Sequence, residues 1–235
     1  MKGTKPQADK SVDALYQNLR RKHGDDNSKA NGYLWHGYFL REQKILFNFL
    51  DSDAQTILDV GCGSGLMCVP LIGKRKLVAG VDFNQGACLD AKANGITVIR
   101  GDAFELPIAS ASIDEIICCQ FFNQQSESAV TQFVSESARV LRPGGHVIMI
   151  WRNHEAYVHR IALALFRVLE RLRHVPKFPY ENHTIESVSR VGERFNLTAH
   201  YAAVAFPPFS WVSEATGSWR AKFIGASNLS ILTRQ

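Results

Sequence analysis

The segment that decides the fold is Ile57-Leu58-Asp59-Val60-Gly61-Cys62-Gly63-Ser64-Gly65. An apolar run leads directly into a turn that has glycine at every second position. Because glycine has no side chain, the backbone can bend sharply there and a ligand can approach it closely. A helix that follows such a turn offers free N–H groups at its start. The segment therefore predicts a buried strand, a ligand-binding loop and a helix over 66–73.

Short apolar runs recur along the chain and alternate with stretches long enough for helices. The runs lie at 57–60, 77–81, 97–99, 115–119 and 146–150, and the helix-length stretches lie at 66–73, 85–94 and 126–141. Two later runs, at 198–206 and 229–233, predict two more strands. Apolar runs separated by helices are typical of parallel strands that are buried on both faces. We predict an α/β fold with a Rossmann-like, doubly wound, mostly parallel seven-stranded sheet flanked by helices and preceded by a helical N-terminal leader.

The composition is that of a globular protein, because 46% of the 235 residues are hydrophobic and 21% are charged. Residues 1–26 lack the continuous apolar region of a secretory signal, and no stretch approaches the roughly 20 apolar residues of a membrane span. The five cysteines are odd in number and lack C-x-x-C spacing. Such cysteines are expected to be reduced and packed, in a cytoplasmic compartment.

The net charge of +5 is unevenly distributed along the chain. Residues 1–56 carry +2, residues 57–150 carry −2 and residues 151–235 carry +5. The densest basic run, 160–173, spaces its arginines as on the solvated face of an amphipathic helix. We therefore do not expect nucleic acid as a partner, although an RNA-binding or RNA-methylating protein remains an alternative that the C-terminal charge permits.

Two acidic residues stand where the second and third apolar runs end. Asp82 lies 17 residues after Gly65 and can accept hydrogen bonds from both hydroxyls of a ribose. Asp102 can accept a hydrogen bond from an adenine amino group. The pattern predicts a cofactor that contains a nucleoside. A dinucleotide site prefers G-x-G-x-x-G, whereas Leu66 stands at the third glycine position, so an NAD-linked oxidoreductase is the alternative.

From Thr56 to Trp151 these motifs resemble the class I S-adenosylmethionine-dependent methyltransferases, in particular the type 11 branch related to the ubiquinone and menaquinone biosynthesis methyltransferases. Segments 112–117 and 141–146 resemble the signatures of the fourth strand and of the turn before the fifth. The resemblance implies S-adenosylmethionine as cofactor and methyl transfer as the activity. It also implies the cofactor-binding residues, namely Asp59, Gly61, Cys62, Gly63 and Gly65 in the loop, Asp82 and Phe83, Asp102 and Ala103, and Cys119 and Gln120.

The chain departs from the family after the fourth strand. That branch commonly has a histidine there, whereas the stretch 119–124 has none. The catalytic residues are therefore unknown, with His154 and Asn123 as candidates. Cys118 and Cys119 are expected to pack in the strand because nothing nearby would stabilise a thiolate. No metal site is predicted.

The acceptor of the methyl group is expected to be a small molecule that is anionic or aromatic. We divide the chain into a helical cap (1–55) and a methyltransferase domain (56–235) in which 155–227 contains a lid or wall on the acceptor side. The residues expected to line the acceptor are aromatic or basic and flank the predicted cofactor site: Trp35, Tyr38, Arg41, Trp151, Arg152 and Tyr157.

Overall fold

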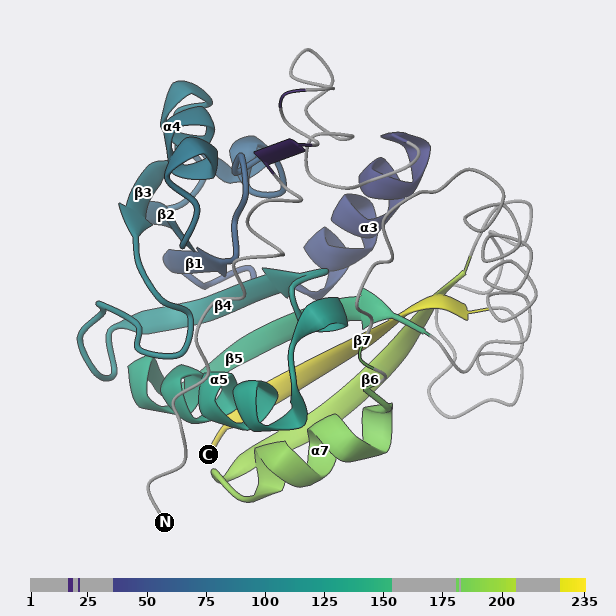
Figure 1. Ribbon diagram of the computed structural model, residues 1–235. Coiled ribbons are helices and arrows are strands. Elements are labelled where there is room, and N and C mark those ends of the chain that lie inside the picture. Colours follow the sequence, from purple (N-terminus) through teal and green to yellow (C-terminus); the bar gives the residue numbers. More distant parts are fainter. Residues whose placement is uncertain (1–16, 19–20, 22–35, 154–180, 182, 206–224) are drawn as a thin grey trace, which may run out of the picture.

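The computed structural model describes residues 17–18, 21, 36–153, 181, 183–205 and 225–235, and it arranges them around one sheet (Figure 1). The sheet has seven strands in the order β3-β2-β1-β4-β5-β7-β6. In chain order the elements are α3 (His36–Phe49), β1 (Thr56–Val60), the 3-10 helix η1 (Val69–Leu71), β2 (Leu77–Asp82), α4 (Gln85–Ala93), β3 (Thr97–Arg100), β4 (Ile113–Cys119), the 3-10 helix η2 (Phe122–Gln124), α5 (Glu127–Val140), β5 (Leu141–Arg152), α7 (Ile185–Glu193), β6 (Leu197–Ala205) and β7 (Gly225–Arg234).

The direction of the strands determines where a ligand can bind. β1 to β5 run parallel, and β7 is antiparallel to both of its neighbours, β5 and β6. The chain moves outward from β1 to β3 and then returns to place β4 on the other side of β1. In open α/β sheets, ligands bind outside the carboxyl ends of the strands at such a reversal. The predicted mostly parallel, seven-stranded sheet is confirmed, and its topology points to the ends of β1 and β4.

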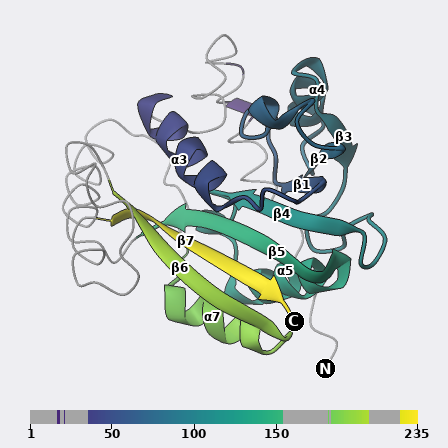
Figure 2. The same cartoon turned by 180° about the vertical axis from the view of Figure 1, so that it is seen from behind.

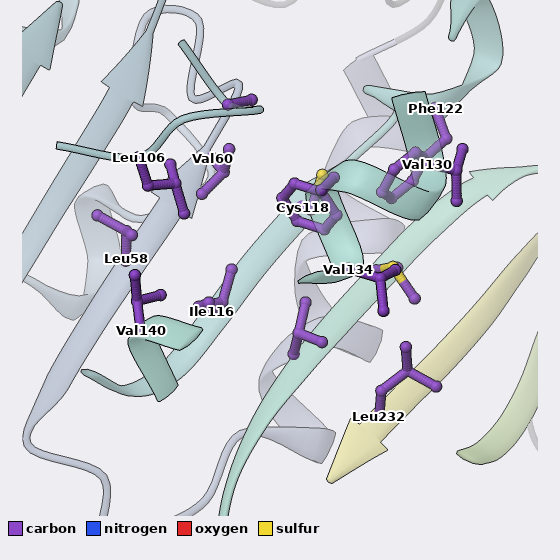
Figure 3. Packing of buried hydrophobic residues seen from close by; sticks show 14 of the residues in the cluster. Leu58, Val60, Leu106, Ile116, Cys118, Phe122, Val130, Val134, Val140 and Leu232 are labelled. Atoms are coloured by element: carbon purple, nitrogen blue, oxygen red, sulfur yellow. The ribbon is translucent and has the colours of Figure 1, made fainter. Parts of the chain in front are cut away.

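Alternate strand residues enter two hydrophobic cores, one on each face of the sheet. On one face, residues such as Leu58, Ile116 and Cys118 pack beneath α5 and α7 (Figure 3). On the other face, residues such as Ile57 and Ile117 pack with α3 and α4. Seen from behind, α3 crosses the face of the sheet that is turned away from α5 and α7 (Figure 2). Each face therefore has its own layer of helices, as a doubly wound fold requires.

Three helices begin at side chains that cap their first turn. The side-chain oxygens of Asn84, Ser126 and Thr184 accept hydrogen bonds from backbone N–H groups three residues later, at 2.9, 3.3 and 3.1 Å. Such caps satisfy N–H groups that have no partner within the helix. The predicted helices over 85–94 and 126–141 are confirmed as α4 and α5.

The helix predicted over 66–73 is wrong, because only η1 forms there. An α-helix would need Pro70 to donate a hydrogen bond to the carbonyl of Leu66, and proline has no N–H. The N–H of Leu71 instead donates to the carbonyl of Cys68, at 2.9 Å. The carbonyls of Leu66 and Met67 accept hydrogen bonds from the side chain of Gln43, at 3.0 and 3.1 Å.

Two other elements differ from the sequence prediction. α7 was not predicted, although Thr184 caps its first turn and Val188 and Val191 are buried one helical turn apart. β5 begins at Leu141 rather than near residue 146, and its pairing with β4 shifts between Ile113 and Glu115. Within the described residues, no helix is both long enough and apolar enough to cross a membrane.

Candidate cofactor site at the carboxyl edge of the sheet

The glycine-rich loop after β1 has the backbone that its sequence predicts. Gly61, Gly63 and Gly65 have φ angles of 72°, 54° and 75°, which L-residues with side chains rarely adopt. A Cβ at Gly61 would lie 2.8 Å from Phe121 Cδ2, and one at Gly65 would lie 2.7 Å from Ile96 Cγ1. Because η1 replaces the expected α-helix, a helix N-terminus does not follow this loop. That absence weakens the case for a dinucleotide, whose pyrophosphate rests on such a terminus.

Asp82, at the end of β2, fixes the position of the glycine-rich loop. Its Oδ2 accepts a hydrogen bond from the N–H of Gly63, and its Oδ1 accepts one from the N–H of Asn84, both at 2.8 Å. The N–H of Gly61 donates to the carbonyl of Val81, also at 2.8 Å. Each carboxylate oxygen can accept more than one hydrogen bond, so these two bonds do not prevent Asp82 from accepting hydrogen bonds from a ligand.

Asp59 is a second carboxyl group at the same edge and is only 2% exposed. The pKa of Asp59 is raised to about 7, mainly by burial and also by the charge of Asp82, while a hydrogen bond from Cys68 acts in the opposite direction. The Cys68 thiol donates to Asp59 Oδ2 over 3.5 Å. Two neighbouring carboxyl groups disfavour each other's ionisation, and a nearby positive charge would reverse that effect. The electrostatics at this edge therefore favour a cationic ligand.

The ends of β2 and β3 provide an aromatic surface beside these carboxyl groups. The side chain of Phe83 is 46% exposed, and the guanidinium carbon of Arg100 lies 5.8 Å from the centre of its ring. Asp102 Oδ1 accepts a hydrogen bond from the N–H of Phe104 at 2.9 Å, and Ala103 is buried. An exposed ring at this position suits the stacking of a flat heterocycle.

Gln120, directly after β4, has a left-handed backbone with φ of 60°. This conformation costs a residue with a side chain about 1–3 kcal/mol, so the surroundings must hold it. The N–H of Gln120 donates to the carbonyl of Ile150 at 2.6 Å. The side chain of Asn123 donates to the carbonyl oxygen of Gln120 at 3.1 Å and to its Oε1 at 2.7 Å. Cys119, just before it, is partly exposed.

Helix α3 completes this edge with a buried polar network that the sequence analysis missed. Glu42 is fully buried, and its Oε1 accepts hydrogen bonds from Gln120 Nε2 at 2.6 Å and from Ser227 Oγ at 2.7 Å. Tyr38 also hydrogen-bonds Ser227. Burial raises the pKa of Tyr38 well above its usual value, and Glu42 adds to that effect, so Tyr38 stays protonated near neutral pH. The available signal was an acid one helical turn from Phe39 and Ile45 on the apolar side of a helix.

Comparison with known proteins agrees with this geometry. The family model described as a methyltransferase domain matches residues 58–149. A probable S-adenosylmethionine-dependent methyltransferase of Mycolicibacterium smegmatis is 30% identical over 112 residues, which cover 46% of this chain and 43% of that protein. A ubiquinone biosynthesis O-methyltransferase of Saccharophagus degradans is 28% identical over 48% of this chain and 53% of its own length. Residues 58–149 therefore match a methyltransferase domain, and the chain is similar to S-adenosylmethionine-dependent methyltransferases.

Solved methyltransferase structures have the same fold as this chain. An S-adenosylmethionine-dependent methyltransferase of Thermotoga maritima, described as a possible histamine N-methyltransferase, has a TM-score of 0.66 at 18% identity and covers 94% of this chain and all of its own. Magnesium protoporphyrin IX methyltransferase of Synechocystis, with bound S-adenosylhomocysteine, has a TM-score of 0.62 at 13% identity and covers 94% of both chains. The chain spans about half the length of each of the two sequence relatives described above.

The residues at this edge of the sheet fit S-adenosylmethionine, which is the cofactor of these similar proteins. S-adenosylmethionine carries a sulfonium and an ammonium group, and Asp59 and Asp82 supply negative charge at the edge where they would lie. The two carboxylate oxygens of Asp82 suit two ribose hydroxyls, and the exposed ring of Phe83 suits adenine. Among the described residues, no group of three or more histidine, cysteine or acidic side chains is placed to hold a metal ion.

Some of the residues expected on the acceptor side lie outside the described part of the chain, and one lies in the core. Trp35, His154 and Tyr157, together with the basic run 160–173, lie outside the described residues. Trp151 is 1% exposed and belongs to the core beneath α5 and α7, where its Nε1 donates to the carbonyl of His183 at 2.7 Å. This placement does not support the expected contact of Trp151 with an acceptor, because its side chain points into the core rather than toward the edge.

Three further candidates for the acceptor side lie among the described residues. Tyr38 is buried in the α3 network, and Arg41 is half-buried on the same helix. Arg152 ends β5 opposite Ser227, and its N–H donates to Asn123 Oδ1 at 2.9 Å. Both ends of the Asn123 amide therefore bond the protein itself, and they link Gln120, after β4, to Arg152 at the end of β5.

Proposed function

We propose that this chain transfers a methyl group from S-adenosylmethionine to a small-molecule acceptor beside the ends of β4 and β5. The observation that carries the proposal is the placement of Asp59 and Asp82 around one glycine-rich loop. Bound S-adenosylmethionine supplies an electrophilic methyl group for in-line displacement by the acceptor. Because this reaction disperses charge, the chain's residues contribute mainly by orienting the reactants and excluding water.

The cofactor-binding residues have distinct proposed tasks. Asp82 orients the ribose and, through Gly63, the loop itself. Asp59 balances the positive charge of the methionine part, and Phe83 packs against the adenine whose edge faces Asp102 and Ala103. The backbones of Cys62, Cys119 and Gln120 complete the walls of the site. A general base is required only when the acceptor arrives protonated.

Arg152 and the aromatic leader support an acceptor that is anionic or aromatic. Arg152 lies at the carboxyl end of β5, where it pairs with Ser227, and the side chain of Ser227 hydrogen-bonds Tyr38. We assign the acceptor surface to Tyr38, Arg41 and Arg152, with Trp35, His154 and Tyr157 as further candidates. The five cysteines are all free thiols, which supports a reducing, cytoplasmic compartment.

Calorimetric titration tests the cofactor. We expect S-adenosylhomocysteine to bind tightly and NADH not to bind, because the loop is followed by η1 rather than by an α-helix. Binding of NADH without binding of S-adenosylhomocysteine would contradict the proposal. Labelled S-adenosylmethionine and a panel of small molecules then identify the acceptor.

The charge of the acceptor is tested with Arg152→Ala and a matched control, Arg142→Ala. Arg142 pairs with Asp114 at 2.5 Å at the opposite edge of the sheet. Arg152→Ala should raise KM for anionic acceptors about tenfold while neutral analogues change little, and Arg142→Ala should change neither. Equal losses for charged and neutral acceptors would contradict an anionic acceptor.

A further inference from the structure

Two adjacent residues of α3 hold the two loops that enclose the proposed cofactor site. Glu42 accepts a hydrogen bond from Gln120 in the loop after β4, and Gln43 donates to the carbonyls of Leu66 and Met67 after the glycine-rich loop. We propose that Glu42 and Gln43 are positioning residues that couple the packing of α3 to cofactor affinity. This inference rests on the proposed function, since the same cofactor provides its readout.

Gln43 supplies a donor that the loop after β1 cannot supply itself. Pro70 has no N–H to donate to the carbonyl of Leu66, and the N–H of Leu71 donates to the carbonyl of Cys68. The two hydrogen bonds from Gln43, at 3.0 and 3.1 Å, satisfy the carbonyls that the missing helix would have used. Removing them frees the segment directly after Gly65.

Glu42 stabilises an unfavourable backbone in the loop after β4. The backbone of Gln120 is left-handed. Its side-chain Nε2 donates to Glu42 Oε1 at 2.6 Å and to Ser227 Oγ at 3.3 Å. The next residue, Phe121, packs against Gly61 so closely that a Cβ there would lie 2.8 Å from its ring. A shift of Gln120 would therefore be transmitted to the glycine-rich loop.

The coupling follows from the position of these loops. They leave β1 and β4, the neighbouring strands between which the strand order reverses. α3 is anchored to the sheet by its own apolar side chains, including Phe39, Ile45 and Leu46. A ligand held by both loops must then favour the packed state of α3, and by thermodynamic reciprocity the packed helix must favour the ligand.

The experiment compares Glu42→Ala and Gln43→Ala with Asp114→Ala, which removes hydrogen bonds at the opposite edge. Calorimetry at a temperature where each variant is folded gives the Kd for S-adenosylhomocysteine. We expect Glu42→Ala to raise Kd about tenfold and Gln43→Ala about fivefold, within the range typical of coupled sites. Asp114→Ala should lower thermal stability and leave Kd within about twofold of the wild-type value, because the affected bonds are remote from the site.

A rescue variant distinguishes two roles of Glu42, namely positioning of Gln120 and mere attachment of α3 to the sheet. Glycine adopts the left-handed backbone without a steric cost. When Gln120→Gly is added to Glu42→Ala, it should therefore recover at least about half of the loss in log affinity that Glu42→Ala causes. Cofactor binding should also increase hydrogen-exchange protection in α3 of the wild-type chain. If Glu42→Ala does not fold, the half-exposed Gln43 carries the test with Gln43→Ala.

Two outcomes separate this inference from the proposed function. Folded variants that bind S-adenosylhomocysteine with the wild-type Kd would overturn the role of α3 and leave the proposed function intact. A folded wild-type chain that binds neither S-adenosylhomocysteine nor S-adenosylmethionine would overturn the proposed function itself.

Discussion

The two edges of the sheet use carboxyl groups in opposite ways. At the carboxyl edge, Asp59 is buried beside Asp82, and burial and that neighbouring charge raise its pKa to about 7. At the amino edge, burial alone would raise the pKa of Asp114, but hydrogen bonds from Thr56, Gln55 and Arg142 lower it below its usual value. The comparison shows that an aspartate satisfied by the protein joins strands, whereas one left near another acid is available for a cationic ligand.

Glu115 also has a raised pKa but lies away from the carboxyl edge, so it serves as a control for Asp59. It is fully buried in the amino half of β4, burial raises its pKa to about 7, and its Oε2 has no hydrogen-bond partner. Asp59 and Glu115 therefore share a raised pKa but lie toward opposite ends of the sheet. Only Asp59 should make cofactor binding depend on pH.

The largest effect is expected from Asp82→Ala. The variant removes the acceptors that we propose for the ribose hydroxyls and the bond that holds Gly63, so cofactor affinity should fall about a hundredfold or more. Calorimetric titration with S-adenosylhomocysteine measures the loss, and circular dichroism should show an intact fold. An unchanged Kd would remove Asp82 from the site.

Asp114→Ala should lower the stability of the chain and leave cofactor affinity unchanged, which is the reverse of the result expected for Asp82→Ala. The carboxylate accepts hydrogen bonds from the N–H groups of Gln55 and Thr56 at 3.0 and 2.8 Å and from the Thr56 hydroxyl at 2.8 Å. Their loss should lower the free energy of unfolding by about 1–3 kcal/mol, measured by urea denaturation, with cofactor affinity unchanged. A large loss of affinity here would show that the two edges are not independent.

The pH dependence of affinity should separate Asp59 from Glu115. A cationic cofactor binds the ionised form of Asp59, so below pH 7 its affinity should fall by up to about tenfold per pH unit. Asp59→Asn should remove this dependence, whereas Glu115→Gln should retain it. If the pH dependence of affinity is lost in Glu115→Gln and kept in Asp59→Asn, then Glu115 rather than Asp59 is the titrating group.

The smallest expected effect concerns the stability of the cofactor-free chain. The raised pKa of Glu115 means that its carboxyl group loses a proton less readily when the chain is folded. Its contribution to stability is therefore full below pH 4.5 and is lost as pH rises through about 7. Thermal unfolding of Glu115→Gln should depend less on pH across this window than that of the wild type. An identical pH profile for both chains would contradict the raised pKa.

The sequence predicts most of the sheet and the backbone of the glycine-rich loop because both depend on local patterns. The apolar runs give the strands, and the glycine spacing gives the positive φ angles at Gly61, Gly63 and Gly65. The helix predicted over 66–73 fails where a single proline removes a donor. α7 has a cap and apolar spacing that a closer examination of 184–191 could have found.

The α3 network could not be predicted in the same way. Glu42 is 78 residues from Gln120 and 185 residues from Ser227 along the chain. Nothing in the local sequence indicates which distant groups will meet a buried acid. The pattern shows only that Glu42 shares a helical stripe with apolar residues, and the fold supplies its partners.

The measurement that tests the central claim most directly is proton release when S-adenosylmethionine binds at pH 7. Titration calorimetry in two buffers with different ionisation enthalpies gives the number of protons released. Because Asp59 has a pKa of about 7 without the cofactor, binding should release about half a proton, and Asp59→Asn should abolish that release. Binding without proton release, or release that persists in Asp59→Asn, would contradict a cation site built on Asp59 at the carboxyl edge of the sheet.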